Sequence, residues 1–332
     1  MKLIHETLNL LSCGEAVSMK NLSVTPLLTS VGNEPDYLTL DEALARGEVR
    51  VTETSEAGEV PELRLDNRAD QPVLLVDGEE LVGAKQNRVL NLTILAPPKA
   101  TITIPVSCVE AGRWAHSSPE FSTKGRAFYA AGRARKASHI TESLRSSGTR
   151  RSRQGEVWND IAEKCGRMQS HSATDAMACL FEDYGDQVDE YVQAIQPTVG
   201  QVGAVFAING QVRGVELFDF AATLRKLYPK LVRSYALDAV DEQSHGSATS
   251  GPSPEQFVKA VASAEASTHP AVGEGTDVRL SGPHLSGGAL EARGRLVHLC
   301  AFQLADGAMR GTGIRGGAMA RASLRRGYHR SR

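Results

Sequence analysis

The sequence predicts an α+β protein with antiparallel β-sheets, in which an N-terminal β-rich part and C-terminal strands enclose a central group of helices. Strand patterns dominate the first third of the chain, helical patterns fill the middle, and strands return near the end. An Asn209-Gly210 pair between two apolar runs indicates a tight hairpin, because both turn positions need a positive φ. Strands and helices do not alternate regularly, so a parallel sheet of βαβ units is not expected.

The composition is that of a globular protein with a full hydrophobic core. The chain has 332 residues, of which 41% are hydrophobic and 5% aromatic, so aliphatic side chains must supply most of the core. The net charge of -2 gives no overall attraction to nucleic acid. We expect one large domain over 1–307 and a basic, disordered tail over 308–332, because seven arginines and no acid follow position 308.

Cysteine usage and hydropathy indicate a cytoplasmic protein without a membrane partner. The five cysteines form no C-x-x-C pair, which favours reduced thiols in a reducing compartment. The residues before Cys13 are too few and too polar for a signal peptide. No run of about 18 apolar residues is present, so no transmembrane helix is expected.

In the first third of the chain, apolar runs and alternating patterns predict strands, with one short helix at 40–46. The strands are expected at 22–29, 49–53, 62–66, 73–76, 79–82, 88–96 and 101–109. Asp77-Gly78 predicts a hairpin that joins the runs on either side of it. Pro105 cannot donate a ladder hydrogen bond, so its strand should lie at a sheet edge or carry a bulge.

In the middle of the chain, apolar side chains recur at helical spacing. Helices are expected at 130–144, 154–165, 175–184, 187–195, from 220 onward and at 254–264. Asp219 is placed to cap the helix that follows it, and Pro229 should kink or split that helix. Residues 241–255 read as a solvated linker, and two or three antiparallel strands are expected within 277–304.

Residues 117–153 have the composition of a basic, mobile arm. Nine basic residues and one acid, Glu142, lie between positions 124 and 153. The arm could bind the phosphate groups of RNA, with an affinity that depends on salt, or it could bind a protein partner. The preferred interpretation is a solvated loop whose charge balances acidic regions elsewhere.

Polar residues concentrate in 76–114. Lys85, Asn87 and Arg88 carry N–H donors suited to phosphate or carboxylate. The strand that begins at Arg88 is the expected antiparallel partner of 101–109, which places Glu110 beside Arg88, with Arg113 and Trp114 nearby. These groups could form a pocket for an anionic, aromatic ligand, or a structural ion pair with a buried indole.

Two glutamates are the candidates for acid–base chemistry. Glu79 and Glu80 are consecutive strand residues, so only one of them can face a shared pocket. We expect Glu79 or Glu110 to act as a general acid or base, or to hold Mg²⁺, if the protein is an enzyme. Cys165, His171 and Cys179 match no zinc-finger spacing, so the sequence requires no metal.

The runs 76–95, 104–114, 154–158 and 203–219 resemble the ADP-ribosylglycohydrolase-and-rhodanese-phosphatase-associated protein domain, a bacterial and archaeal family. The resemblance extends roughly from residue 10 to residue 305. It implies association with proteins that handle ADP-ribose and phosphoesters, and it supplies no catalytic roles. The leading hypothesis is therefore a protein that binds or processes an ADP-ribose-like or other phosphorylated nucleotide. The alternative is a non-catalytic module for a protein or RNA partner.

Overall fold

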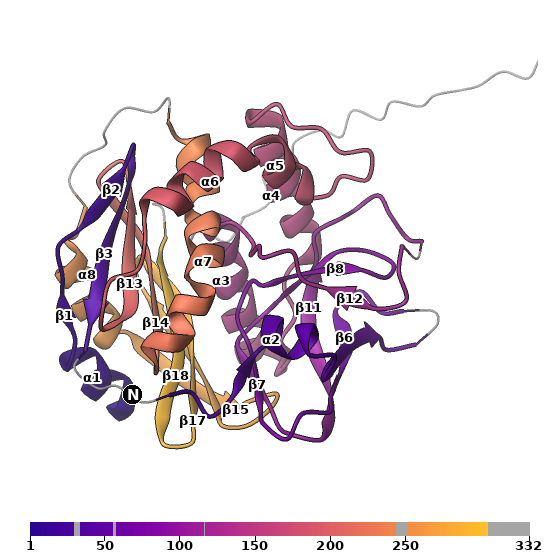
Figure 1. Ribbon diagram of the computed structural model, residues 1–332, viewed down its shortest axis with the longest axis horizontal. Coiled ribbons are helices and arrows are strands. Elements are labelled where there is room, and N and C mark those ends of the chain that lie inside the picture. Colours follow the sequence, from indigo (N-terminus) through magenta and orange to yellow (C-terminus); the bar gives the residue numbers. More distant parts are fainter. Residues whose placement is uncertain (30–33, 56–57, 116, 244–250, 305–332) are drawn as a thin grey trace, which may run out of the picture.

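A computed structural model describes residues 1–29, 34–55, 58–115, 117–243 and 251–304. Two long helices, α3 (Ala130–Ser147) and α7 (Ala221–Asp241), lie between a large antiparallel sheet and a smaller β region (Figure 1). The α+β class predicted from the sequence is confirmed. The expected tail and the middle of the expected linker lie outside the described residues.

The large sheet joins strands from both ends of the chain. Its order is β1-β3-β13-β14-β18-β17-β16-β15, and β2 also pairs with β3. The strands are β1 (Ser12–Cys13), β2 (Val17–Met19), β3 (Leu22–Leu28), β13 (Gln201–Ile208), β14 (Gln211–Phe218), β15 (Glu265–Pro270), β16 (Thr276–Gly282), β17 (Leu285–Ala292) and β18 (Arg295–Gln303). The predicted hairpin turn is confirmed, since Asn209 and Gly210 have φ values of 52° and 78° and connect β13 to β14.

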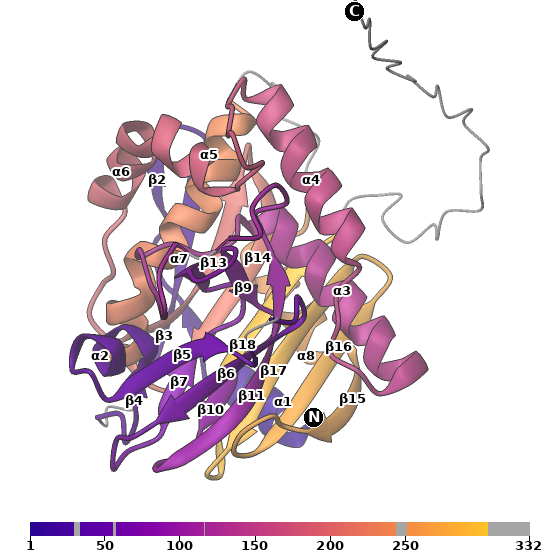
Figure 2. The same cartoon turned by 90° about the vertical axis from the view of Figure 1, so that its right-hand side faces the viewer.

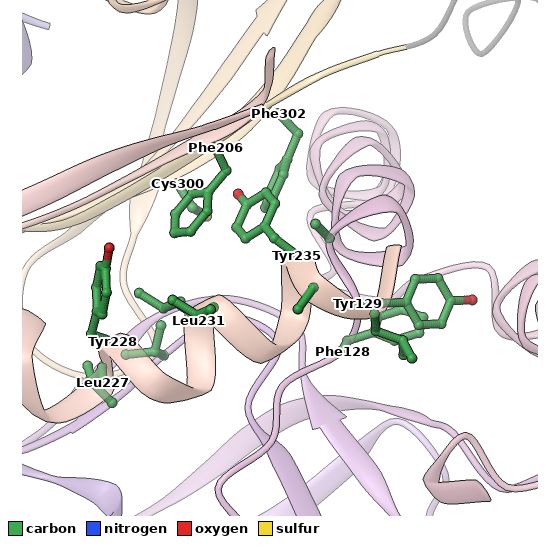
Figure 3. Packing of buried hydrophobic residues seen from close by; sticks show 14 of the residues in the cluster. Phe128, Tyr129, Phe206, Leu227, Tyr228, Leu231, Tyr235, Cys300 and Phe302 are labelled. Carbon is green, nitrogen blue, oxygen red and sulfur yellow. The ribbon is translucent and has the colours of Figure 1, made fainter. Parts of the chain in front are cut away.

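Helices cover both faces of this sheet. On one face α3 and α7 build an aromatic core, in which Tyr235 of α7 stacks on Phe206 of β13 with ring centroids 3.9 Å apart (Figure 3). The opposite face packs against α1 (Lys2–Asn9) and α8 (Pro254–Ala262) through Leu8, Phe257 and other apolar side chains. The sequence analysis did not predict α1.

The smaller β region consists of two sheets, visible beside α3 and α7 in Figure 2. One has the order β10-β7-β4, and the other β12-β8-β9-β11-β6-β5. The elements are β4 (Leu38–Thr39), α2 (Leu40–Ala45), β5 (Val49–Glu53), β6 (Glu62–Asn67), β7 (Val73–Leu75), β8 (Glu80–Gly83), β9 (Arg88–Leu90), β10 (Ile94–Ala96), β11 (Ala100–Cys108) and β12 (Phe121–Ser122).

The predicted Asp77-Gly78 hairpin is wrong. β7 and β8, on either side of it, belong to different sheets, and the expected strand 88–96 is likewise divided into β9 and β10. Gly78 does adopt a positive φ of 81°, but the Arg133 side chain packs against it and Asp77 bonds to α3. These distant contacts override the local hairpin signal. Pro105 lies where β11 changes partner from β6 to β9, a position that suits a residue without an N–H.

The remaining helices are α4 (Gln154–Arg167), α5 (Ala178–Asp183) and α6 (Gly185–Ala194). Helix α7 is not split at Pro229. Asp219 does not cap α7, because its carboxylate instead accepts hydrogen bonds from Tyr37 and Arg295. Among the described residues, no helix is long and apolar enough to cross a membrane.

The segment expected to be a basic arm, 117–153, contains α3, which confirms the helix predicted at 130–144. Arg133 and Lys136 of this helix are fully buried and face the interior. Arg126 pairs with Glu80, and Arg135, Arg151 and Arg153 pair with Asp160, Glu62 and Glu142 respectively. Composition alone did not show that Arg126, Arg133 and Lys136 are the partners of buried carboxylates.

Candidate functional site

The polar residues of the segment 76–114 are brought together where β9 begins and β11 ends. These strands pair antiparallel, with Arg88 opposite Cys108. The loop before β9 and the loop after β11 therefore lie side by side, and the backbone N–H of Val109 donates to the carbonyl of Asn87. The predicted proximity of Arg88 and Glu110 is a direct result of this pairing.

Arg88 is buried without a full set of partners. Its side chain has no exposed area, and Nη1 donates to Gln86 Oε1 at 3.2 Å and to the Asn87 carbonyl at 3.4 Å. Nε and Nη2 have no hydrogen-bond partner, and within the described part of the chain no carboxylate oxygen lies within 4.0 Å of the guanidinium. Burial accordingly lowers the pKa of Arg88, which nearby acidic groups only partly offset.

The two unpartnered nitrogens share one edge of the guanidinium plane. Their N–H bonds run nearly parallel, and this is the edge that binds both oxygens of a carboxylate or phosphate. Trp114 lies over Arg88, with its ring centroid 5.9 Å from Cζ, and Lys85 Nζ is 5.3 Å from the same ring. Trp114 is 49% exposed, so its indole lies between the buried guanidinium and the solvent.

Glu110 pairs with Arg113 and not with Arg88. Arg113 Nη2 donates to Glu110 Oε2 at 2.6 Å and Nε donates to Oε1 at 2.9 Å. Glu110 also accepts hydrogen bonds from the Asn87 N–H and the Thr174 hydroxyl. Burial opposes ionisation, but these donors lower the pKa of Glu110 below its ordinary value, so the carboxylate is charged at neutral pH.

Arg113 and the side-chain oxygen of Asn87 are engaged by contacts within the fold. Arg113 Nη1 donates to the Ala84 and Ala115 carbonyls, in addition to the bonds with Glu110. Asn87 Oδ1 accepts from Arg113 Nη2 and from the Gly83 N–H. Both side chains therefore hold the loop around Arg88 in shape.

Glu79 and Glu80 point in opposite directions, as strand geometry predicted, and neither contacts Arg88. Glu79 binds Lys230 of α7 and accepts a hydrogen bond from the Val76 N–H. Glu80 accepts from Arg126 Nε at 2.8 Å. Burial raises the pKa of both carboxyl groups despite their basic partners.

Three further residues lie at this site, and the sequence analysis did not select them. The Cys108 thiol donates to Gln86 Oε1 at 3.1 Å, and the indole of Trp158 lies close to the same sulfur. Burial raises the pKa of Cys108, which favours the thiol form. Glu53 Oε1 accepts from the Lys85 N–H at 3.3 Å, whereas Glu53 Oε2 is buried and has no partner. No local motif could have identified these contacts, because they join separate strands and helices.

A family model for the ARG and Rhodanese-Phosphatase-superfamily-associated Protein domain, ARPP-1, matches residues 10–302. The protein belongs to the ARPP-1 family. No curated protein and no solved structure matches the chain. The ARPP-1 match spans the large sheet, the smaller β region and the helices between them, so every residue of the site around Arg88 lies inside the family region.

A second polar cluster, the central network, occupies the core of this ARPP-1 protein. Its members come from α3, α7 and both β regions, and all of them are buried: Asp77, Thr93, Arg133, Lys136, Glu216, Tyr235 and His298. Arg133 donates to Glu216 at 2.6 Å and to Asp77 at 3.1 Å, and Lys136 donates to Asp77 at 2.7 Å. The network joins the two β regions of the ARPP-1 fold through α3.

Neither polar cluster resembles a metal centre, and neither lines the hollow at the edge of the large sheet. In the described parts of the chain, no three His, Cys, Asp or Glu side chains are grouped to hold a metal ion. The hollow, of about 460 Å³, lies beside β3 and is lined by Val17, Leu28, Tyr228 and neighbouring residues. It contains none of the residues around Arg88.

Proposed function

We propose that this ARPP-1 protein binds a small phosphorylated ligand of the ADP-ribose or nucleotide class at Arg88. The observation that carries the proposal is the unpartnered Nε/Nη2 edge of a guanidinium that has no exposed area. A buried charge without a counter-charge is costly, and a bound phosphate would offset that cost through two charge-assisted hydrogen bonds.

The neighbours of Arg88 suit the rest of such a ligand. Trp114 offers a half-exposed aromatic face on which a base could stack. Lys85 adds a positive charge near the same ring. The free Glu53 Oε2 is an acceptor of the kind that binds ribose hydroxyls. Because Arg88 is covered, the ligand reaches it only when a covering group such as the Trp114 indole moves aside.

In this proposal Glu110 positions the site. Its carboxylate is engaged by Arg113, Thr174 and the Asn87 backbone, so it fixes the loop that presents Arg88. Glu79 lies outside the site, bound to Lys230. The proposal is therefore one of ligand binding and assigns no residue a catalytic step.

The test is thermal unfolding with ADP-ribose, NAD, nucleoside mono- and diphosphates and inorganic phosphate, each with and without Mg²⁺. A ligand present at about 100 times its dissociation constant should stabilise the wild-type protein by roughly 2.7 kcal/mol. Arg88→Met should abolish that shift. Without ligand, Arg88→Met should be at least as stable as wild type, because it removes a desolvated charge that lacks a counter-ion.

The exposed Arg145 provides the matched control, since Arg145→Met removes a positive charge far along α3. It should leave both the stability and the ligand shift unchanged. A purely structural role for Arg88 predicts the reverse pattern. In that case no phosphorylated compound shifts the wild type, and Arg88→Met is strongly destabilised without ligand.

A further inference from the structure

Two cysteines that are distant from Arg88 face each other across the α4–α5 connection. Cys165 lies in the last turn of α4 and Cys179 in the first turn of α5, 14 positions later. Their sulfur atoms are 3.7 Å apart, and both are free thiols. A disulfide would require these sulfurs to approach to the bonding distance of about 2.05 Å.

The two thiols are chemically unequal. The hydrogen bond between the two thiols, together with the Ser170 hydroxyl beside the sulfur, lowers the pKa of Cys179 to about 7, against the effect of burial. The same hydrogen bond raises the pKa of Cys165, and burial raises it further. Cys179 is therefore the more acidic of the two thiols and the better candidate for the attacking sulfur.

The loop between the two cysteines is attached to the strand end that carries Glu110. The Thr174 hydroxyl donates to Glu110 Oε1 at 2.8 Å, and the Thr174 carbonyl accepts from the Gly112 N–H at 2.8 Å. The Met177 N–H donates to the Val109 carbonyl at 2.9 Å. A covalent bond between α4 and α5 would close this loop into a ring.

We infer that Cys165 and Cys179 form a redox-active dithiol whose oxidant is a hydroperoxide. The Cys179 thiolate attacks one peroxide oxygen, the O–O bond breaks, and Cys179 becomes a sulfenic acid as hydroxide or alkoxide leaves. The Cys165 sulfur then attacks the Cys179 sulfur, a disulfide forms, and the sulfenic oxygen leaves as water with the Cys165 proton. A dithiol reductant reverses the reaction. This inference does not depend on a ligand at Arg88.

The test treats the reduced full-length protein with hydrogen peroxide at neutral pH and maps the cysteines by peptide mass spectrometry. The expected product is a Cys165–Cys179 disulfide, reversible with dithiothreitol, that forms before any other cysteine reacts. Cys13 is the internal control, because like Cys165 it is partly exposed, whereas Cys179 is buried, and because burial and Glu255 raise the pKa of Cys13. Cys13→Ser should not change the rate.

Cys165→Ser supplies a second readout. Without its resolving partner, Cys179 should stop at the sulfenic acid, which dimedone traps, and the rate of peroxide consumption should fall as the pH drops below about 7. The inference is overturned if Cys165 and Cys179 are both recovered as free thiols from wild-type protein under conditions that oxidise Cys13. The wild-type map decides this even where Cys165→Ser folds poorly.

Discussion

Replacing Arg133 with methionine tests whether the central network holds the two β regions together. The guanidinium of Arg133 is fully buried and donates to Glu216 at 2.6 and 3.3 Å and to Asp77 at 3.1 Å. Methionine fills much of the same volume but leaves Glu216 with only Tyr235 and His298 as partners. Removing one member of a buried ion pair costs about 3–5 kcal/mol, and we expect a loss of that size.

Urea unfolding followed by circular dichroism measures this loss. With a slope of roughly 2–3 kcal/mol per molar urea, the midpoint should fall by about 1–2 M. Arg145→Met makes the same substitution on the same helix at an exposed position, and should change the stability by no more than about 0.5 kcal/mol. The double variant Arg133→Met/Glu216→Gln should be more stable than Arg133→Met alone, because the unpaired carboxylate is gone.

Two outcomes would refute this reasoning. If Arg133→Met costs no more than Arg145→Met, the buried contacts of Arg133 contribute nothing net to folding. If the costs of Arg133→Met and Glu216→Gln simply add in the double variant, the two residues are not energetically coupled, despite the distance of 2.6 Å between Nη1 and Oε1.

Two other buried groups give further predictions. Burial raises the pKa of Asp219 from 3.8 to about 6, so the folded state holds this proton more tightly than the unfolded state. The free energy of unfolding of the wild type should therefore fall by about 3 kcal/mol as the pH rises from roughly 4 to 6. Asp219→Asn should lack this fall in plots of Tm against pH, and parallel plots would contradict the assignment. Lys230→Met should cost about 3 kcal/mol or more in urea unfolding, because it leaves Glu79 buried without its partner. The same change at Lys226, which is 40% exposed, should cost under about 1 kcal/mol, and equal costs would count against the buried pair.

Local sequence patterns correctly predicted the fold class and one of the two hairpins. Asn209-Gly210 formed its hairpin because the conformational requirement of that turn is satisfied within four residues. Asp77-Gly78 carries the same kind of signal, but the Asp77 carboxylate is bound by Arg133 and Lys136 from α3. Side chains more than fifty positions away decide that conformation, and no local pattern contains them.

The sequence predicted which residues of the candidate site lie near one another, but it did not predict which of them form hydrogen bonds. Strand pairing placed Arg88 beside Glu110, and strand alternation sent Glu79 and Glu80 to opposite faces. The choice of Arg113 over Arg88 as the partner of Glu110 depends on which side chain reaches the carboxylate in three dimensions. That choice leaves the guanidinium edge of Arg88 free, and it cannot be read from spacing along the chain.

The chain contains two tryptophans, and both lie at the site around Arg88. Trp114 covers the guanidinium, and Trp158 lies close to the Cys108 thiol beside it. Intrinsic indole fluorescence of this 332-residue protein therefore arises from a single neighbourhood. Excitation selective for tryptophan reports the local polarity there without any label. Movement of Trp114 into or out of water would shift the emission maximum, so occupancy of the site could be followed in solution in real time.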